Sequence, residues 1–178
     1  MIGSLLGGLL IMILVLGAWM GSFRHVEVSR KKAGPFRLIY KTQSGTDMQA
    51  VRSNTEAVAA ELDRQGIQQR RPLQVYFGAG QQHQIGFCIP QDQALKQALS
   101  ADIKERSIEE TGYLCAEFPW RNPASFAVGY AKVTPALSRY CQQHKLLADQ
   151  TLVLLDNGLI RYLQRVTAGD QKLSLIHI

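Results

Sequence analysis

Hydrophobic and polar residues are distributed unevenly along this chain. Residues 2–23 form an apolar run without a charged side chain, whereas all Lys, Arg, Asp and Glu residues lie between Arg24 and Lys172. A helix of about 22 residues, rising 1.5 Å per residue, is long enough to cross a hydrocarbon core of about 30 Å. The run therefore predicts a transmembrane anchor over residues 1–23, followed by a folded domain over residues 24–172.

A cleaved signal peptide is the alternative interpretation of the apolar run. Such a peptide needs a basic segment before its apolar core and small residues three apart before its cleavage site. The sequence has no basic side chain before Ile2 and no convincing small pair in residues 16–22. The basic residues instead follow the run, at Arg24 and in Arg30-Lys31-Lys32. By the positive-inside rule, we expect a single-pass membrane protein with its N-terminus outside and its domain in the cytoplasm, where these residues meet anionic lipid headgroups.

After the apolar run, one order of predicted elements occurs twice, in residues 24–90 and 112–168, separated by a polar linker over 91–111. The first unit is expected to contain strands at 26–29 and 36–41, a helix from Asp47 to Gly66, and strands at 73–77 and 84–89. The second is expected to contain strands at 113–118 and 124–131, a helix from Thr134, and strands at 152–155 and 159–166 joined by Asn157-Gly158. A short helix is expected at 93–99 of the linker. Two strand-strand-helix-strand-strand units predict the α+β class, with an antiparallel sheet, helices on one side and a cleft between the units.

Composition limits the function classes. With 178 residues, 46% apolar and three cysteines, the chain can form a hydrophobic core and is too poor in cysteine for a disulfide scaffold. Cys88, Cys115 and Cys141 are expected to be reduced, and the histidines show no zinc-ligand spacing with them, so no metal or other cofactor is predicted. The net charge of +6 includes no basic cluster interleaved with aromatics, so we expect no nucleic-acid partner.

Residues 173–178, with the sequence LSLIHI, resemble the in-frame translation of a common sequencing-library adapter. We expect them to be an artefact rather than part of the domain.

Several short motifs occur in an order that resembles the GyrI-like domain of the SOUL/GyrI superfamily. They are Val26-Glu-Val-Ser29, Tyr40-Lys41, Val75-Tyr-Phe77, Phe118-Pro-Trp120 and Val133-Thr-Pro-Ala-Leu137. Within the superfamily, the order of motifs and the apolar N-terminus are most similar to the membrane-anchored testis-expressed ER-phagy receptor family, over roughly residues 2–169. The resemblance implies a tandem duplication with a ligand cleft between its halves. Ligand-binding members usually carry Glu-x-Tyr where this chain has Val153-Leu154-Leu155, which implies that no cleft carboxylate attracts cationic ligands here.

Apolar and aromatic residues are the candidate cleft lining, although most of them could equally fill the core. Period-two alternation predicts that Val153 and Leu155 share the cleft face, with Leu152 and Leu154 beneath the helices. The candidate ligand-binding residues are Tyr40, Phe77, Trp120, Tyr130, Val153 and Leu155.

Catalytic chemistry has little support in the sequence. Glu117 alternates with Tyr113 and Cys115 on one strand face and could act as a general base, but a solvated carboxylate is the simpler interpretation. No nucleophile motif such as G-x-S-x-G is present, and His144 is expected on the inner helix face or at its frayed end rather than as a haem ligand. We therefore expect a membrane-anchored, non-enzymatic domain that binds a neutral or amphipathic molecule in an apolar cleft. The alternatives are an adaptor that recruits protein partners through its surface or a C-terminal tail, and a hydrolase or haem-binding relative of the fold.

Overall fold

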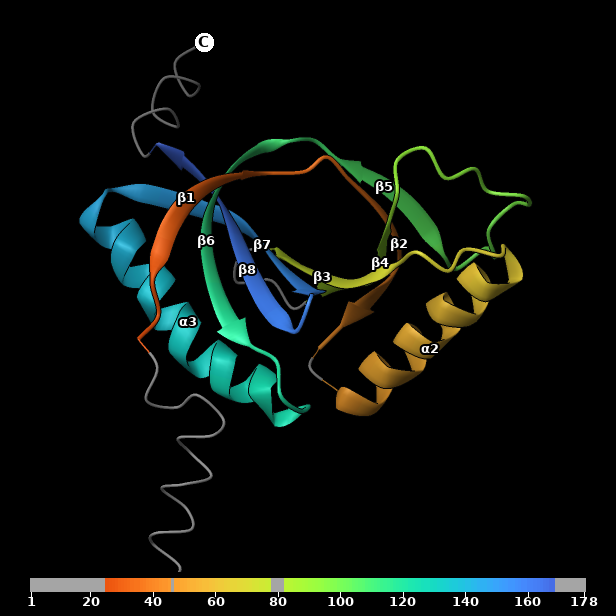
Figure 1. Ribbon diagram of the computed structural model, residues 1–178, viewed down its shortest axis with the longest axis horizontal. Helices are drawn as coiled ribbons and strands as arrows, with labels where there is room; N and C mark the ends of the chain where they lie inside the picture. The colour runs from red at the N-terminus through yellow and green to blue at the C-terminus, as the bar shows by residue number, and fades with distance from the viewer. Residues whose placement is uncertain (1–24, 46, 78–81, 169–178) are drawn as a thin grey trace, which may run out of the picture.

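The computed structural model describes residues 25–45, 47–77 and 82–168, which form one antiparallel sheet of eight strands with helices α2 and α3 on its outer side (Figure 1). The strand order is β1-β6-β8-β7-β3-β4-β2-β5. The α+β class, the antiparallel pairing and the placement of both helices on one side confirm the prediction. The elements are β1 (Val28–Ala33), β2 (Phe36–Ser44), α2 (Met48–Arg64), β3 (Arg71–Phe77), β4 (Gln82–Ile89), β5 (Lys104–Ile108), β6 (Thr111–Pro119), α3 (Ala124–Gln143), β7 (Leu146–Asp156) and β8 (Leu159–Ala168).

The order strand-strand-helix-strand-strand occurs twice along the chain, as β1-β2-α2-β3-β4 and as β5-β6-α3-β7-β8, and these two runs are called the first and second unit. The first strand of each run lies in the half of the sheet formed by the other run. β1 pairs with β6 of the second unit, β5 pairs with β2 of the first, and β3 pairs with β7 where the halves meet. Strand β5 (Lys104–Ile108) lies in the stretch expected to be a linker, and residues 93–99 form no helix. The strand is hard to predict because, within its sequence KERSI, only Ile108 is a buried apolar residue.

Helix α3 corrects the largest error of the sequence prediction. The expected strand at 124–131 is the first part of this helix, and Pro135 lies inside the helix rather than in its first turn. Phe126, Val128 and Tyr130 alternate as in a strand, but the residues that face the sheet are spaced by four, as one side of a helix requires. These buried positions are Ser125, Gly129, Val133, Leu137 and Cys141. Near the start of the helix, the Ser125 hydroxyl accepts hydrogen bonds from the amides of Arg121 and Asn122 at 3.0 and 3.2 Å.

Local signals at other element ends are confirmed. The carboxylate of Asp47 caps α2 by accepting a hydrogen bond from the Gln49 amide at 2.9 Å, and Gly66 follows the helix with φ of 74°. Asn157 and Gly158 both have positive φ, 49° and 72°, as the predicted tight turn between β7 and β8 requires. His144 is the exposed C-cap residue of α3, so of its two expected positions it occupies the helix end and not the inner face.

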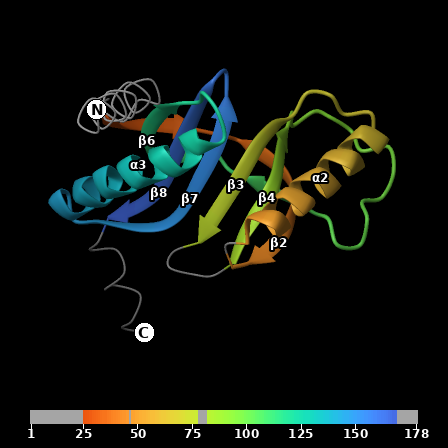
Figure 2. The ribbon, with the colours of Figure 1, turned by 90° about the horizontal axis from the view of Figure 1, so that it is seen from below.

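The curved sheet separates the core into an outer part beneath the helices and an inner part on the concave face. Figure 2 shows both helices lying over the same face of the sheet. Helix α2 packs Val58 and Leu62 against Ile39 and Phe87 of the first half. Helix α3 packs its apolar side against β6, β7 and β8 of the second half. Neither of the two described helices covers the concave face, which carries its own buried cluster.

Within the described ranges, no helix has the length and apolar character needed to cross a membrane. The transmembrane helix predicted for residues 1–23 and the adapter-like residues 173–178 lie outside these ranges.

Candidate functional site

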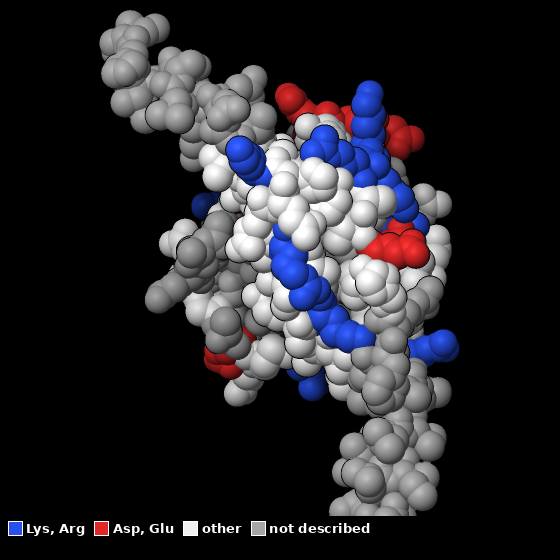
Figure 3. All heavy atoms as spheres, turned by 90° about the vertical axis from the view of Figure 1, so that its left-hand side faces the viewer, with Lys and Arg blue, Asp and Glu red and all other residues white. Residues whose placement is uncertain are grey.

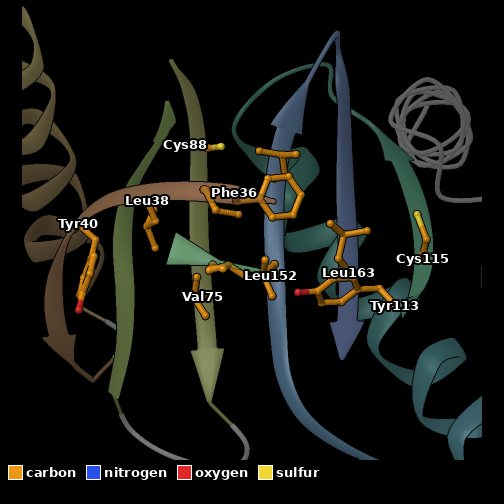
Figure 4. Close-up of a cluster of buried hydrophobic side chains, with 12 residues drawn as sticks. Phe36, Leu38, Tyr40, Val75, Cys88, Tyr113, Cys115, Leu152 and Leu163 are labelled. Carbon is orange, nitrogen blue, oxygen red and sulfur yellow. The ribbon is translucent and has the colours of Figure 1, made fainter. Parts of the chain in front are cut away.

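The concave face combines a buried apolar surface with a group of charged side chains at one end. Its apolar part comes from strands of both units, and strand register explains why: Leu73 lies opposite Leu154, Val75 opposite Leu152, and Cys115 opposite Leu163. Opposed residues in an antiparallel pair point to the same face. Figure 4 shows members of this surface, among them Val75, Leu152 and Leu163, side by side on neighbouring strands. The cluster comprises Phe36, Leu38, Tyr40, Leu73, Val75, Cys88, Ile108, Tyr113, Cys115, Leu152, Leu154 and Leu163.

The expected orientation of strand β7 is reversed. Leu152 and Leu154 point to the concave face, while Val153 and Leu155 pack in the cluster beneath α3. Residues 152–155 are all apolar because both faces of this central strand are covered, and such a run gives no sign of which alternate residues face which way. The sequence therefore correctly predicts that alternate residues of β7 point to opposite faces of the sheet, but it assigns each set of residues to the wrong face.

The six candidate ligand-binding residues are not brought together. Tyr40 and Phe77 belong to the concave face. The others lie on the helical side: Trp120 contacts Phe126 edge-on at 5.1 Å between ring centroids, and Tyr130 on α3 is 60% exposed. Val153 and Leu155 lie under α3, as described above, so the six residues do not form a single site.

Five charged side chains from five neighbouring strands form a row across one end of the concave face. We call Lys31, Glu117, Arg161, Asp156 and Arg71 the charged row. Glu117 Oε1 lies 3.4 Å from Lys31 Nζ and 3.4 Å from Arg161 Nε. Asp156 Oδ2 accepts a hydrogen bond from Arg161 Nη1 at 3.0 Å and lies 3.5 Å from Arg71 Nη1. Cations and carboxylates thus alternate along the row, with three cations to two carboxylates.

A pocket of about 320 Å³ lies between the charged row and the apolar cluster. Such a volume is near the lower end of the range found for small-molecule sites. Phe36, Leu154 and Leu163 provide apolar wall, and four members of the charged row provide polar wall. Beyond Glu117, a smaller hollow of about 220 Å³ continues along the first strand to Glu27 and His25. The pocket therefore presents both an apolar and an ionic surface to the same volume.

The thiols near this pocket are poor nucleophiles. Cys88 and Cys115 are buried and free, and burial raises the pKa of each above its ordinary value, although Arg71 and Lys31 respectively oppose the shift. A raised pKa keeps a thiol protonated at neutral pH, and the thiolate is the reactive form. No group of three or more His, Cys, Asp or Glu side chains within the described residues is arranged to hold a metal ion.

Most of the charged row was missed because sequence alone does not give strand register. Glu117 was identified as a residue that shares a face with Tyr113 and Cys115, and the structure confirms that face. Arg161 lies opposite Glu117 only in the folded sheet, and Lys31 and Arg71 come from distant strands. The available signal was a charged residue two positions from a buried apolar one on the same strand face, as with Arg161 and Leu163.

No protein-family model and no curated protein matches this sequence. Among solved structures, the chain is similar to the EcmrR C-terminal domain, with 8% identity and a TM-score of 0.56 over 80% of this chain and 98% of that domain. It is also similar to a hydrolase from Listeria innocua, with 12% identity and a TM-score of 0.52 over 79% of this chain and 92% of that one. A further similar structure is SAV2435 bound to tetraphenylphosphonium, with 10% identity and a TM-score of 0.52 over 82% of this chain and 96% of that one. At these identities the likeness shows the fold alone.

Proposed function

We propose that this domain binds a small molecule on the concave face of its sheet, in the pocket beside the charged row. The observation that carries the proposal is the pocket of about 320 Å³, in which Phe36, Leu154 and Leu163 face the same volume as Lys31 and Arg161. A mostly apolar surface with a few fixed polar groups is typical of small-molecule sites. The solved structure of SAV2435 with a bound ligand is in keeping with binding by this fold.

We propose that the domain binds without catalysing a reaction. The raised pKa values of Cys88 and Cys115 favour their unreactive thiol forms. The carboxylate of Glu117, the general-base candidate of the sequence, lies within 3.4 Å of both Lys31 and Arg161. Ion pairs with two cations favour its role as a fixed charge in the wall of the pocket.

The pocket should prefer neutral or amphipathic molecules to cations. SAV2435 is similar in fold and was solved with the organic cation tetraphenylphosphonium. In this chain the charged row contains three cations and two carboxylates, so an organic cation would meet net repulsion. The expected ligand class therefore differs from the one seen in that structure.

Thermal unfolding of the full chain with a neutral bicyclic probe, 2-naphthylmethanol, tests the proposed site. A ligand that binds only the native state raises the melting temperature. Ala33 borders the pocket, so Ala33→Phe should fill part of it and reduce the shift. The matched control is Ala131→Phe on the exposed surface of α3, which should leave the shift unchanged. No shift in the unmodified chain, or an equal shift in both variants, would contradict the proposal.

We also propose that residues 1–23 hold the domain at a membrane, with the domain in the cytoplasm. The support is the uncharged apolar run and the basic residues that follow it. On the side of the molecule where α3 and β1 lie, Lys and Arg side chains predominate over Asp and Glu (Figure 3), which suits anionic headgroups. Alkaline carbonate extraction and a reporter fused after Lys172 test the topology. Release into the soluble fraction, or a reporter active on the outer side, would contradict it.

A further inference from the structure

We infer that the pocket recognises an amphipathic anion: a carboxylate, sulfonate or similar head group carried on an apolar body. This inference rests on the proposed function, and it adds the chemical class of the ligand and the residues that select it. The head group would lie against Lys31, Arg161 and Arg71, and the apolar body against Phe36 and the neighbouring leucines.

The accessible part of the charged row is mainly cationic. The side chains of Lys31, Arg161 and Arg71 are 53%, 35% and 46% exposed, respectively. Of the two carboxylates, Glu117 is 35% exposed and Asp156 only 11%. The cations therefore outnumber the carboxylates, and each of them is at least as exposed as either carboxylate to a ligand that enters the pocket.

The cations also retain hydrogen-bonding capacity. Lys31 has three N–H donors. Its Nζ lies 3.4 Å from Glu117 Oε1, which is long for a hydrogen bond. Arg71 Nη1 lies 3.5 Å from Asp156 Oδ2, which is likewise a long contact. Charge-assisted bonds are shorter, at about 2.7–2.9 Å, and a carboxylate can accept two of them from one guanidinium. An anionic head group could thus make shorter bonds to these donors than the charged row itself provides.

The two carboxylates have different effects on such a ligand. Asp156 accepts a hydrogen bond from Arg161 and also lies near Arg71, so it fixes the position of two cations. Glu117 contacts Lys31 and Arg161, the two cations that an entering head group would use. Glu117 should therefore compete with the ligand, and its neutralisation should strengthen anion binding while weakening any binding of cations.

Calorimetry with three probes of matched ring system tests the inference: 2-naphthoate, 2-naphthylmethanol and 2-naphthyltrimethylammonium. The protein is the full chain in phosphatidylcholine nanodiscs, with empty nanodiscs as the blank. We expect the anion to bind about tenfold more tightly than the alcohol, since a hydrogen bond to a charged group commonly contributes that much, and the cation to bind most weakly. Lys31→Gln, at an exposed edge-strand position, and Arg161→Gln should each reduce the preference for the anion. Glu117→Gln should increase it.

Arg139→Gln is the matched control, because it removes one positive charge from the exposed surface of α3 without touching the pocket. It should leave the preference for the anion unchanged. If the alcohol binds as tightly as the anion, or if Arg139→Gln has the effect of Lys31→Gln, the inference fails while the proposed binding function stands. If none of the three probes binds, the proposed function itself fails. If Arg161→Gln does not fold, Lys31→Gln and Glu117→Gln still decide between these outcomes.

Discussion

Glu61 is a buried carboxylate that ties the end of α2 to the segment after β4. It accepts hydrogen bonds from Arg64 at 2.6 and 2.7 Å, from the Ser100 hydroxyl at 2.8 Å and from the Gln65 amide at 3.2 Å. The hydrogen bond from Arg64 is the largest cause of a pKa below the ordinary value for Glu61, and burial opposes the shift. These bonds therefore favour the ionised form.

We expect Glu61→Gln to lower the free energy of unfolding by about 1–3 kcal/mol at pH 7, because charge-assisted bonds are lost in a buried site. A carboxylate whose pKa is lower in the folded than in the unfolded protein stabilises the folded state. This stabilisation is fully present above the unfolded pKa of about 4.3, and it is lost as the pH falls through the folded pKa. The difference between the two proteins in urea unfolding should thus shrink below about pH 4. The matched control is Glu56→Gln on the exposed side of α2, which should change stability by less than about 0.5 kcal/mol. A difference that stays constant down to pH 3 would contradict this prediction.

Val153 tests the orientation of β7 directly. It is 6% exposed and packs in the cluster beneath α3, so Val153→Glu places a carboxylate in an apolar core. Burial raises the pKa of such a group, and the cost of ionising it appears above the unfolded pKa. We expect the variant to lose several kcal/mol, with a larger loss at pH 8 than at pH 5, whereas the near-isosteric Val153→Thr should lose less. A stable Val153→Glu protein at both pH values would restore the original assignment of Val153 to an open cleft.

At the scale of elements, α3 approaches the sheet closely at Gly129. A Cβ atom at this position would lie 2.7 Å from Tyr162 Oη and 3.1 Å from a ring carbon of Phe118. Alanine in place of glycine inside a helix normally gains about 1 kcal/mol, but overpacking a core commonly costs about 1–3 kcal/mol. We expect Gly129→Ala to be destabilising overall in chemical unfolding.

The cost of Gly129→Ala should be smaller in a Tyr162→Phe background, since that change removes the nearest clashing atom. The Tyr162 hydroxyl is buried without a hydrogen-bond partner among the described residues, so its own removal should cost little. The two substitutions should therefore be non-additive. Gly112→Ala is the control, because an added Cβ there meets nothing within 4 Å. If the effects of Gly129→Ala and Tyr162→Phe on the free energy of unfolding are additive, the Tyr162 hydroxyl is not the group with which the added methyl clashes.

Local signals predicted the elements where one residue type fixes the backbone, and they failed where tertiary contacts decide. Asp47 and Asn157-Gly158 marked a helix start and a turn correctly because capping and positive φ are properties of a few residues. The start of α3 was missed because alternating apolar residues masked its four-residue spacing. The candidate site was missed for a related reason, since the register that joins Glu117 to Arg161 depends on the whole sheet.

At the scale of the whole molecule, the two units depend on one another. β1 and β5 each lie in the half of the sheet that belongs to the other unit, and the β3–β7 pair joins the halves through the backbone. The connection after β1 also meets the connection after β5, where a Cβ on Gly34 would lie 2.9 Å from the Glu110 Cα. Neither unit therefore has a complete half-sheet of its own.

Because the halves share strands, we expect the domain to unfold in a single cooperative transition. Trp120 reports on the second unit, and Trp19→Phe removes the other tryptophan of the chain. Leu62→Ala truncates a fully buried side chain under α2 in the first unit and should cost about 2–5 kcal/mol. Trp120 fluorescence and far-UV circular dichroism should give coincident urea transitions, and Leu62→Ala should shift both by the same amount. If the Trp120 transition stays in place while the dichroism transition moves, the two units unfold separately, and the strand exchange between them contributes little to their stability.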